Sequence, residues 1–339
     1  MPKGLGAYFE QNPEAEIVIF AGKGGLGKTT SSSGLAYYMS QVMKKRTLLF
    51  STDPQASLSD IFERNIYGQG EVELLPNLFV VEIDADRRVR EYQQQVKQKI
   101  MDMYGLDAVP REIEEYIDST SAEPAMYESA TYDAMAELVA KREYDMYIFD
   151  MPPFGHGVRM VAMADILSKW VEKITDARAK VAEYDAVAAT LKGEAAREDE
   201  VMKELIDIRN KIKSFTDLLT ARRRTAFFMV LIPEQMAILD TERALKMFEN
   251  LGIQMSGLVV NQVYPAELLQ QEGTSDYLRN RVAMQQEHLR TIAQKFGDKV
   301  QAVVPMFTRE PKGIEMIKTA SEYLINCQVQ LPAVRGGVA

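Results

Sequence analysis

The stretch that decides the fold is Ala21-Gly22-Lys23-Gly24-Gly25-Leu26-Gly27-Lys28-Thr29-Thr30. An apolar run at residues 17–20 precedes it, and residues 31–36 continue it, which predicts a buried strand, a glycine-rich turn and a helix. The segment from Gly22 to Thr29 fits the pattern G-x-x-x-x-G-K-[ST]. In such a turn the backbone N–H groups and the helix N-terminus converge on an anion. A solvent-exposed turn can match by chance, but the flanking strand and helix favour a phosphate site.

This pattern assigns chemical roles to the residues of the loop. Lys28 is expected to reach the β- and γ-phosphates, and the Thr29 hydroxyl is expected to ligate Mg²⁺. The other residues expected to hold the nucleotide are Gly24, Gly25, Gly27 and Thr30. We therefore predict that ATP and Mg²⁺ bind here. A second lysine, Lys23, lies inside the loop.

The composition is that of a globular protein in a reducing compartment. Of the 339 residues, 46% are hydrophobic and 26% are charged, enough for a substantial core. The net charge of −9 argues against a non-specific nucleic-acid binder, so no nucleic-acid partner is expected. The single cysteine, Cys327, excludes an internal disulfide and a multi-cysteine metal site within one chain. Without a secretory signal or an apolar run of roughly 18–20 residues, we expect a cytoplasmic protein that is not itself transmembrane.

Short apolar runs recur along the chain and are separated by helical patterns. This alternation predicts an α/β fold with a doubly wound, mostly parallel sheet covered on both faces. Because ligands of such sheets bind at the carboxyl ends of the strands, the chemistry should collect along one edge. We interpret residues 1–339 as a single nucleotide-binding domain. The predicted strands are residues 17–20, 47–51, 78–83, 146–149, 226–232, 258–260 and 300–304.

Two connections, residues 85–144 and 157–224, are too long for simple crossovers. Apolar residues recur in them at helical spacing, so we expect an inserted α-helical subdomain. The charged stretch from 181 to 213 either docks a partner or forms a solvated face, and the solvated face is favoured. The stripes are Val89, Tyr92, Val96, Ile100 and Met103; Met163, Leu167, Trp170 and Ile174; and Val201, Leu205, Ile208, Ile212, Phe215 and Leu219.

Carboxylates follow two of the predicted strands. Asp150 is placed to support Mg²⁺ directly or through water, although an aspartate at a strand end is also a common cap or turn residue. Asp53 could orient the attacking water. Asp60 is a second polar residue of this segment or an ordinary surface aspartate. His156 senses the γ-phosphate or shapes the turn that contains it, and both alternatives stay open.

The motifs together resemble those of the ArsA/guided-entry ATPases, which have a deviant Walker A loop with an early lysine. The early lysine is Lys23 here. Residues 53–60, DPQASLSD, resemble the family's first switch, and residues 150–159, DMPPFGHGVR, resemble its second. The segments IPE…TER (232–243) and VVNQ (259–262) also match. The similarity covers nearly the whole chain, including the long helical insertions.

This resemblance implies a homodimer that is switched by the nucleotide. Lys23 would reach across the dimer to the partner's nucleotide and supply charge in trans, so that Lys23, Lys28 and Asp53 form the catalytic set. The asparagine of the VNQ motif, Asn261, would contact adenine, and Pro305 falls where the adenine loop would be. The chain corresponds to one ATPase unit rather than to a fused pair.

Three functions remain open. In the first, the ATP-closed dimer captures a hydrophobic, tail-anchor-like helix and delivers it to a membrane-embedded partner. Nineteen methionines, including Met101, Met126 and Met160, suit an apolar groove, although methionine also fills ordinary cores. The second is the energising ATPase of an arsenite efflux pump. The third is a positioning switch like the partition and division-site ATPases.

Two departures from the family pattern bear on this choice. Gln55-Ala56 replaces the usual Ala-His of the first switch, and Gln55 is similar to the partition ATPases instead. Family members that bind metalloid use several cysteines, and the guided-entry factor closes its dimer with a paired-cysteine zinc site. Cys327 alone provides neither. Two copies of it would give at most two thiolates, short of the usual four zinc ligands.

Overall fold

The computed structural model describes residues 2–51, 57–104, 106–119, 131, 134–151, 173, 206, 210, 213–214, 216–250 and 252–332. Within these ranges eight strands form one sheet in the order β3-β4-β2-β5-β1-β6-β7-β8. Only β3 runs antiparallel to its neighbour, and the other pairs are parallel. This confirms the predicted α/β fold. The strands are β1 (Ile17–Ala21), β2 (Thr47–Ser51), β3 (Glu71–Leu75), β4 (Leu78–Glu82), β5 (Met146–Asp150), β6 (Thr225–Leu231), β7 (Gly257–Val263) and β8 (Val300–Pro305).

The strand order places the end of β5 beside the end of β1. The chain runs from β1 to β2 and β4 on one side, returns to insert β5 between β2 and β1, and then builds β6 to β8 on the other side. In the parallel register, Phe20 of β1 and Ser51 of β2 both lie opposite Asp150. Asp150 therefore lies at the carboxyl edge of the sheet, next to the start of the glycine-rich loop.

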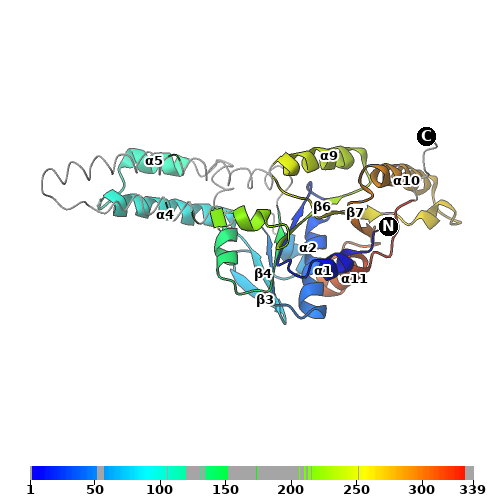
Figure 1. Ribbon diagram of the computed structural model, residues 1–339, viewed down its shortest axis with the longest axis horizontal. Helices are drawn as coiled ribbons and strands as arrows, with labels where there is room; N and C mark the ends of the chain where they lie inside the picture. The colour runs from blue at the N-terminus through cyan, green and yellow to red at the C-terminus, as the bar shows by residue number, and fades with distance from the viewer. Residues whose placement is uncertain are drawn as a thin grey trace, which may run out of the picture. The chain divides into compact units, whose positions relative to one another are not determined.

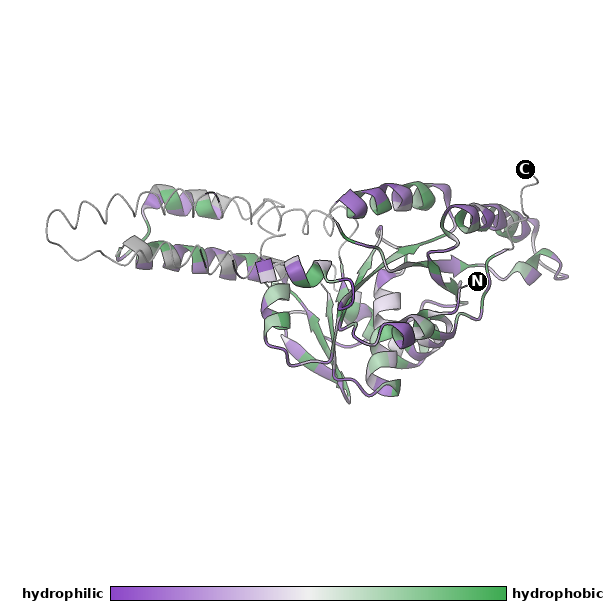
Figure 2. Cartoon of the chain, in the orientation of Figure 1, coloured by the Kyte–Doolittle hydropathy of each residue, from purple (hydrophilic) through white to green (hydrophobic). Residues whose placement is uncertain are grey.

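Helices cover both faces of this sheet (Figure 1). Phe227 and Phe228 are consecutive in β6 and so point to opposite faces. The Phe228 ring packs edge-on against Tyr8 of α1, with ring centroids 5.0 Å apart. Phe227 packs against Phe248 of α9 at 5.7 Å. Figure 2 shows mostly hydrophobic residues in the strands, while the helices carry both polar and hydrophobic residues. The helices here are α1 (Leu5–Gln11), α2 (Lys28–Tyr37), α3 (Ser57–Phe62), α9 (Gln235–Asn250), α10 (Asp276–Phe296) and α11 (Gly313–Asn326), with a π-helical turn η1 (Tyr38–Val42) and a 3₁₀ turn η3 (Ala266–Leu269).

One strand was missing from the sequence prediction. The edge strand β3 pairs with β4 through a tight turn in which Asn77 has a left-handed φ of 65°. Its residues alternate between exposed and half-buried positions, and Glu71 and Glu73 are exposed. A half-solvated edge strand of this kind lacks the continuous apolar run by which the buried strands are found.

The chain divides into two compact units, and the second consists of Ala85–Lys141 and Arg159–Leu219. Its described part contains α4 (Ala85–Tyr104) and α5 (Arg111–Ser119), which lie side by side (Figure 1). The Gln93 amide of α4 donates to the carbonyl of Ile117 at 2.6 Å. One turn along α4, Lys97 forms ion pairs with Asp118 at 2.9 Å and with Glu114 at 3.1 Å. The carboxylate of Asp118, and after it that of Glu114, raises the pKa of Lys97. The contacts fix how α4 and α5 pair along their lengths.

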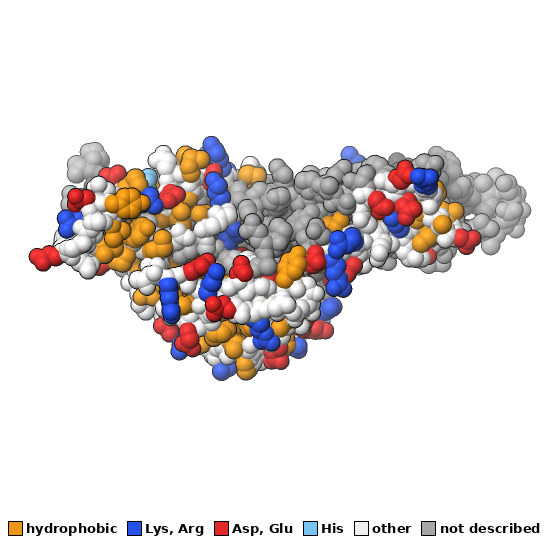
Figure 3. Space-filling view, turned by 180° about the vertical axis from the view of Figure 1, so that it is seen from behind, with side chains coloured by type: hydrophobic (Ala, Val, Ile, Leu, Met, Phe, Trp, Pro, Cys, Tyr) orange, Lys and Arg blue, Asp and Glu red, His pale blue; other side chains and the backbone are white. Residues whose placement is uncertain are grey.

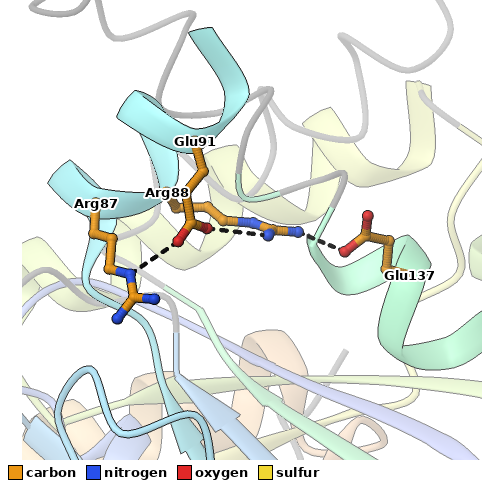
Figure 4. A network of polar contacts seen from close by, with 4 residues as sticks. All are labelled: Arg87, Arg88, Glu91 and Glu137. Carbon is orange, nitrogen blue, oxygen red and sulfur yellow. Dashed lines mark hydrogen bonds and ion pairs between the residues drawn. The ribbon is translucent and has the colours of Figure 1, made fainter. Parts of the chain in front are cut away.

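A second polar network joins α4 to the helical residues 134–140 (Figure 4). Arg88 contacts Glu137 at 2.6 Å and Glu91 at 3.5 Å, while Arg87 contacts Glu91 at 2.8 Å. Because Arg88 is only partly exposed, its bridge is the better-shielded contact of the set. Exposed pairs such as Arg87–Glu91 contribute about 0–1 kcal/mol.

Much of the predicted insertion lies outside the described residues. This applies to the stripe Met163, Leu167, Trp170 and Ile174, to most of the stripe from 201 to 219, and to most of the charged stretch from 181 to 213. Met126 and Met160 fall outside as well. The boundaries 85–144 and 157–224 therefore stay predictions.

The described surface mixes charges of both signs. On the face shown in Figure 3, acidic and basic side chains are interspersed, and hydrophobic side chains gather toward the left of the view. In the part of the chain that the structure describes, no helix has the length and apolar character needed to cross a membrane.

Candidate functional site: a phosphate loop at the sheet edge

The glycine-rich loop connects β1 to α2 as the sequence predicts, and close packing explains one of its glycines. Gly27 has a φ of 91°, and a Cβ there would lie 2.0 Å from Nδ2 of Asn261. Only glycine fits both the left-handed backbone and this approach. Helix α2 begins at the next residue, Lys28. The N–H groups of its first turn therefore lie next to the glycine-rich loop, which is the arrangement that binds anions.

Lys28 and Thr29 lie at the base of the loop. Lys28 is 5% exposed, and its Nζ donates to the carbonyl oxygen of Lys23 at 3.1 Å. The Thr29 hydroxyl donates to Oδ2 of Asp150 at 2.7 Å. Asp150 is 1% exposed. A hydroxyl and a carboxylate, distant in sequence, thus meet beside the loop, and both are oxygen donors of the kind that Mg²⁺ prefers.

Lys23 lies at the surface of the loop. Its side chain is 58% exposed, and its Nζ is 3.5 Å from Oδ2 of Asp240 in α9. Asp240 also lies 3.7 Å from Arg243. Lys23 is thus not buried with Lys28, and its charge is available at the surface of the protein.

Asn261 and Pro305 lie at the ends of neighbouring strands. The Asn261 side chain is buried, and its Nδ2 donates to the carbonyl of Leu26 in the loop at 2.9 Å. Pro305 ends β8 opposite Val263. The structure therefore gives Asn261 a contact with the phosphate loop itself, which sequence reasoning missed. Its predicted contact with adenine stays a prediction.

Glu82 at the end of β4 has a structural role that the sequence analysis did not identify. Its carboxylate is buried and accepts from the N–H groups of Leu58 and Ser59, at 2.6 and 3.0 Å, at the start of α3. It also accepts from the Ser59 hydroxyl. Glu82 thereby anchors the start of α3, which overlaps the predicted first switch, residues 53–60. A charged residue ending an apolar strand was the available signal.

Of the five other residues singled out from the sequence, the structure describes only Asp60. Asp60 is exposed on α3. Asp53, Gln55, Ala56 and His156 lie outside the described residues. Their roles stay predictions.

The family profile described as "Anion-transporting ATPase" matches residues 15–326. The chain belongs to this family, the ArsA ATPases. The match runs from β1 through α11 and so contains the phosphate loop, Asp150 and Asn261. The ArsA resemblance inferred from the motifs is confirmed, and membership makes the chain an ATPase.

Relatives of this ArsA-family chain carry two kinds of name. It is 31% identical to a putative arsenical pump-driving ATPase of Aquifex aeolicus over 91% of this chain and 98% of the relative. It is 27% identical to an ATPase ASNA1 homolog of Paramecium tetraurelia over 93% and 95%. It is 28% identical to ATPase GET3 of Malassezia globosa over 91% and 90%. Similarity therefore extends over nearly the full length of relatives of both kinds.

The one cysteine of this ArsA-family chain is buried away from the phosphate loop. Cys327 follows α11 in a left-handed conformation, with a φ of 44°. Its Sγ accepts from the N–H of Val303 at 3.3 Å and donates to the carbonyl of Val329 at 3.3 Å. Burial raises the pKa of the thiol, which disfavours the thiolate that binds soft metals. Within the described ranges, no group of three or more metal-ligating side chains occurs.

Proposed function

We propose that this ATPase works as a nucleotide-switched homodimer that captures a hydrophobic, tail-anchor-like helix and delivers it to a membrane. The observation that carries the nucleotide site is the hydrogen bond between Thr29 and Asp150 at the base of the loop. The relatives named ASNA1 and GET3 ATPases and the resemblance to guided-entry ATPases support the client. On this basis the protein acts in the cytoplasm.

Mg²⁺ fits the residues at the base of the loop. Thr29 would ligate it, and Asp150 would hold it directly or through water. When bound, it would neutralise charge on the β- and γ-phosphate oxygens. Asp150 is buried and hydrogen-bonded to Thr29, so the Thr29 hydroxyl and Oδ2 of Asp150 are already held together where the ion would bind.

Each of the other site residues has its own role in ATP binding or hydrolysis. Lys28 binds the β- and γ-phosphates, and Asp53 orients the water that attacks the γ-phosphorus while the bond to the ADP oxygen breaks. Lys23 of the second subunit stabilises the charge that develops. Asn261 and Pro305 contact the adenine, and the loop backbone at Gly24, Gly25, Gly27 and Thr30 holds the phosphates.

The Asp150→Asn variant tests the metal assignment. Asparagine keeps the shape and can still accept from Thr29, but it lacks the negative charge. We expect the Mg²⁺ concentration for half-maximal ATPase activity to rise by about 10–100-fold. Asp145→Asn is the matched control, because Asp145 lies just before β5 at the opposite sheet edge, where it accepts from the N–H of Arg46. An Asp150→Asn curve that overlays the wild-type curve would remove Asp150 from the metal site.

A reconstituted capture assay tests the client. The purified protein is mixed with a synthetic peptide bearing a C-terminal apolar helix of about 20 residues, and then with liposomes. We expect cross-linking to the peptide to require ATP and transfer to liposomes to require hydrolysis. A peptide with charged residues in the helix is the control. Equal capture with and without ATP would contradict the proposal.

The second candidate, an arsenite pump ATPase, is favoured by the name of the Aquifex aeolicus relative. Because the only thiol is buried and hydrogen-bonded, we expect arsenite to leave ATP turnover unchanged. The check is an ATPase titration with arsenite on the wild type and on Cys327→Ser. Stimulation that survives Cys327→Ser would indicate a non-thiol metalloid site, and stimulation lost in that variant would indicate a thiol site. Either result would favour the pump.

A further inference from the structure

Two adjacent side-chain amides at the end of β7 hold the backbone of the phosphate loop. Besides the bond from Asn261 to the Leu26 carbonyl, Nε2 of Gln262 donates to the carbonyl of Gly25 at 3.2 Å. Two successive loop carbonyls are thus fixed on β7, 235 and 237 residues away in the sequence.

Fixing these carbonyls also fixes the direction of the loop N–H groups. In a planar trans peptide the C=O and the following N–H point in opposite directions. Carbonyls of Gly25 and Leu26 that face β7 therefore turn the N–H groups of Leu26 and Gly27 away from β7. Gly25 has a φ of 77°, and a Cβ there would meet nothing within 4 Å, so Gly25 itself contributes no side-chain packing to hold this peptide. The amide side chains provide the restraint that glycine lacks.

Gln262 is itself held in an uncommon conformation by a third amide. Its φ is 57°, in the left-handed region that residues with a Cβ rarely adopt. Gln285 of α10 is buried; its Nε2 donates to the Gln262 carbonyl at 2.9 Å, and its Oε1 accepts from the N–H of Tyr264 at 2.7 Å. Both ends of the Gln285 amide are therefore used to shape the turn that aims Gln262 at the loop.

We propose that Gln262 and Gln285 are positioning residues that preorganise the phosphate loop for nucleotide binding. Gln262 acts through the Gly25 carbonyl, and Gln285 acts through Gln262. The proposal rests on the nucleotide site proposed above. On this proposal, the end of β7 and the residue Gln285 of α10 raise nucleotide affinity through the loop backbone, without contacting the adenine.

Two substitutions at position 262 separate the restraint from the backbone strain. Gln262→Ala removes the donor and keeps a Cβ in the left-handed conformation, whereas Gln262→Gly removes the donor and relieves the strain. We expect both variants to raise the KM for ATP and the Kd for a fluorescent ATP analogue about five-fold, the effect of one neutral hydrogen bond. The kcat should stay within about two-fold, and Gln262→Gly should melt at the higher temperature.

A change in Gln285 tests the relay. Gln285→Glu keeps the acceptor for the Tyr264 N–H but cannot donate to the Gln262 carbonyl when ionised. We expect a KM increase similar to that of Gln262→Ala. Gln294→Glu is the matched control, because Gln294 is exposed on the same helix, and it should leave the KM unchanged.

The outcomes separate this proposal from the proposed nucleotide site. If the wild type binds ATP and Lys28→Ala does not, but Gln262→Ala and Gln262→Gly bind as the wild type does, then the restraint is wrong and the site stands. If only the less stable variant, Gln262→Ala, loses ATP affinity and Gln262→Gly binds ATP normally, then stability and not the hydrogen-bond donor sets the affinity. The role of Gln262 is then structural, and the proposal fails. A wild type that binds no ATP would overturn both.

Discussion

Lys23→Ala is expected to lower ATP turnover by at least about 10³-fold while leaving ATP affinity within about two-fold of the wild type. The charge supplied in trans by a catalytic cation is worth about 10³–10⁵ in kcat. Lys23 is the exposed lysine of the loop, whereas the buried Lys28 remains to bind the phosphates. Steady-state ATPase assays and nucleotide titrations provide the check. Unchanged turnover would remove Lys23 from the mechanism.

Asp240→Asn is the control for this variant. It breaks the ion pair between Lys23 and Asp240 but keeps the lysine. We expect it to retain turnover, because an exposed pair of this kind contributes little to stability. If Asp240→Asn reproduced the loss seen in Lys23→Ala, the ion pair and not the charge in trans would be responsible.

Lys28→Ala is expected to weaken ATP binding by about 10–100-fold and to abolish turnover at ordinary ATP concentrations. Its ammonium group is almost completely buried at the start of α2, where a charge-assisted hydrogen bond contributes about 1.5–3 kcal/mol. Isothermal titration with ATP and Mg²⁺ measures the loss. Lys318→Ala, an exposed lysine on α11, is the matched control. ATP binding that survives in Lys28→Ala would place the phosphates elsewhere.

Mixing the two loop variants tests whether Lys23 acts across a dimer. A Lys23→Ala subunit can hold ATP, and a Lys28→Ala subunit still carries Lys23. In a mixed dimer the second subunit would supply the missing lysine to the first, so turnover should recover in part. Failure of the mixture to exceed the sum of the two single variants would contradict the assignment in trans.

The sequence predicted those parts of the fold that depend on local patterns. The continuous apolar runs of β1, β2 and β4 to β8 identified seven strands, and the loop motif located Lys28 and Thr29. The strand order then brought Thr29 to Asp150, as expected from two strand ends on one edge. The strand predictions succeeded because burial on both faces leaves a strong apolar signal.

Contacts between distant segments were not predictable in the same way. Nothing local indicated that Gln262 would reach the Gly25 carbonyl or that Gln285 would hold Gln262 in a left-handed conformation. Glu82 was missed because its partners, the N–H groups of α3, become its neighbours only when β4 pairs with β2. Amide and carboxylate side chains that serve the backbone leave no spacing pattern.

The glutamates of β3 have a consequence for self-association. An edge strand presents unpaired backbone groups to which another chain can add, and charged side chains on that strand oppose such addition. Glu71 and Glu73 are exposed on the outermost strand, and Pro76 follows it without a backbone donor. Two copies that met along β3 would bring like charges together, so crowding should not drive this protein into extended sheets.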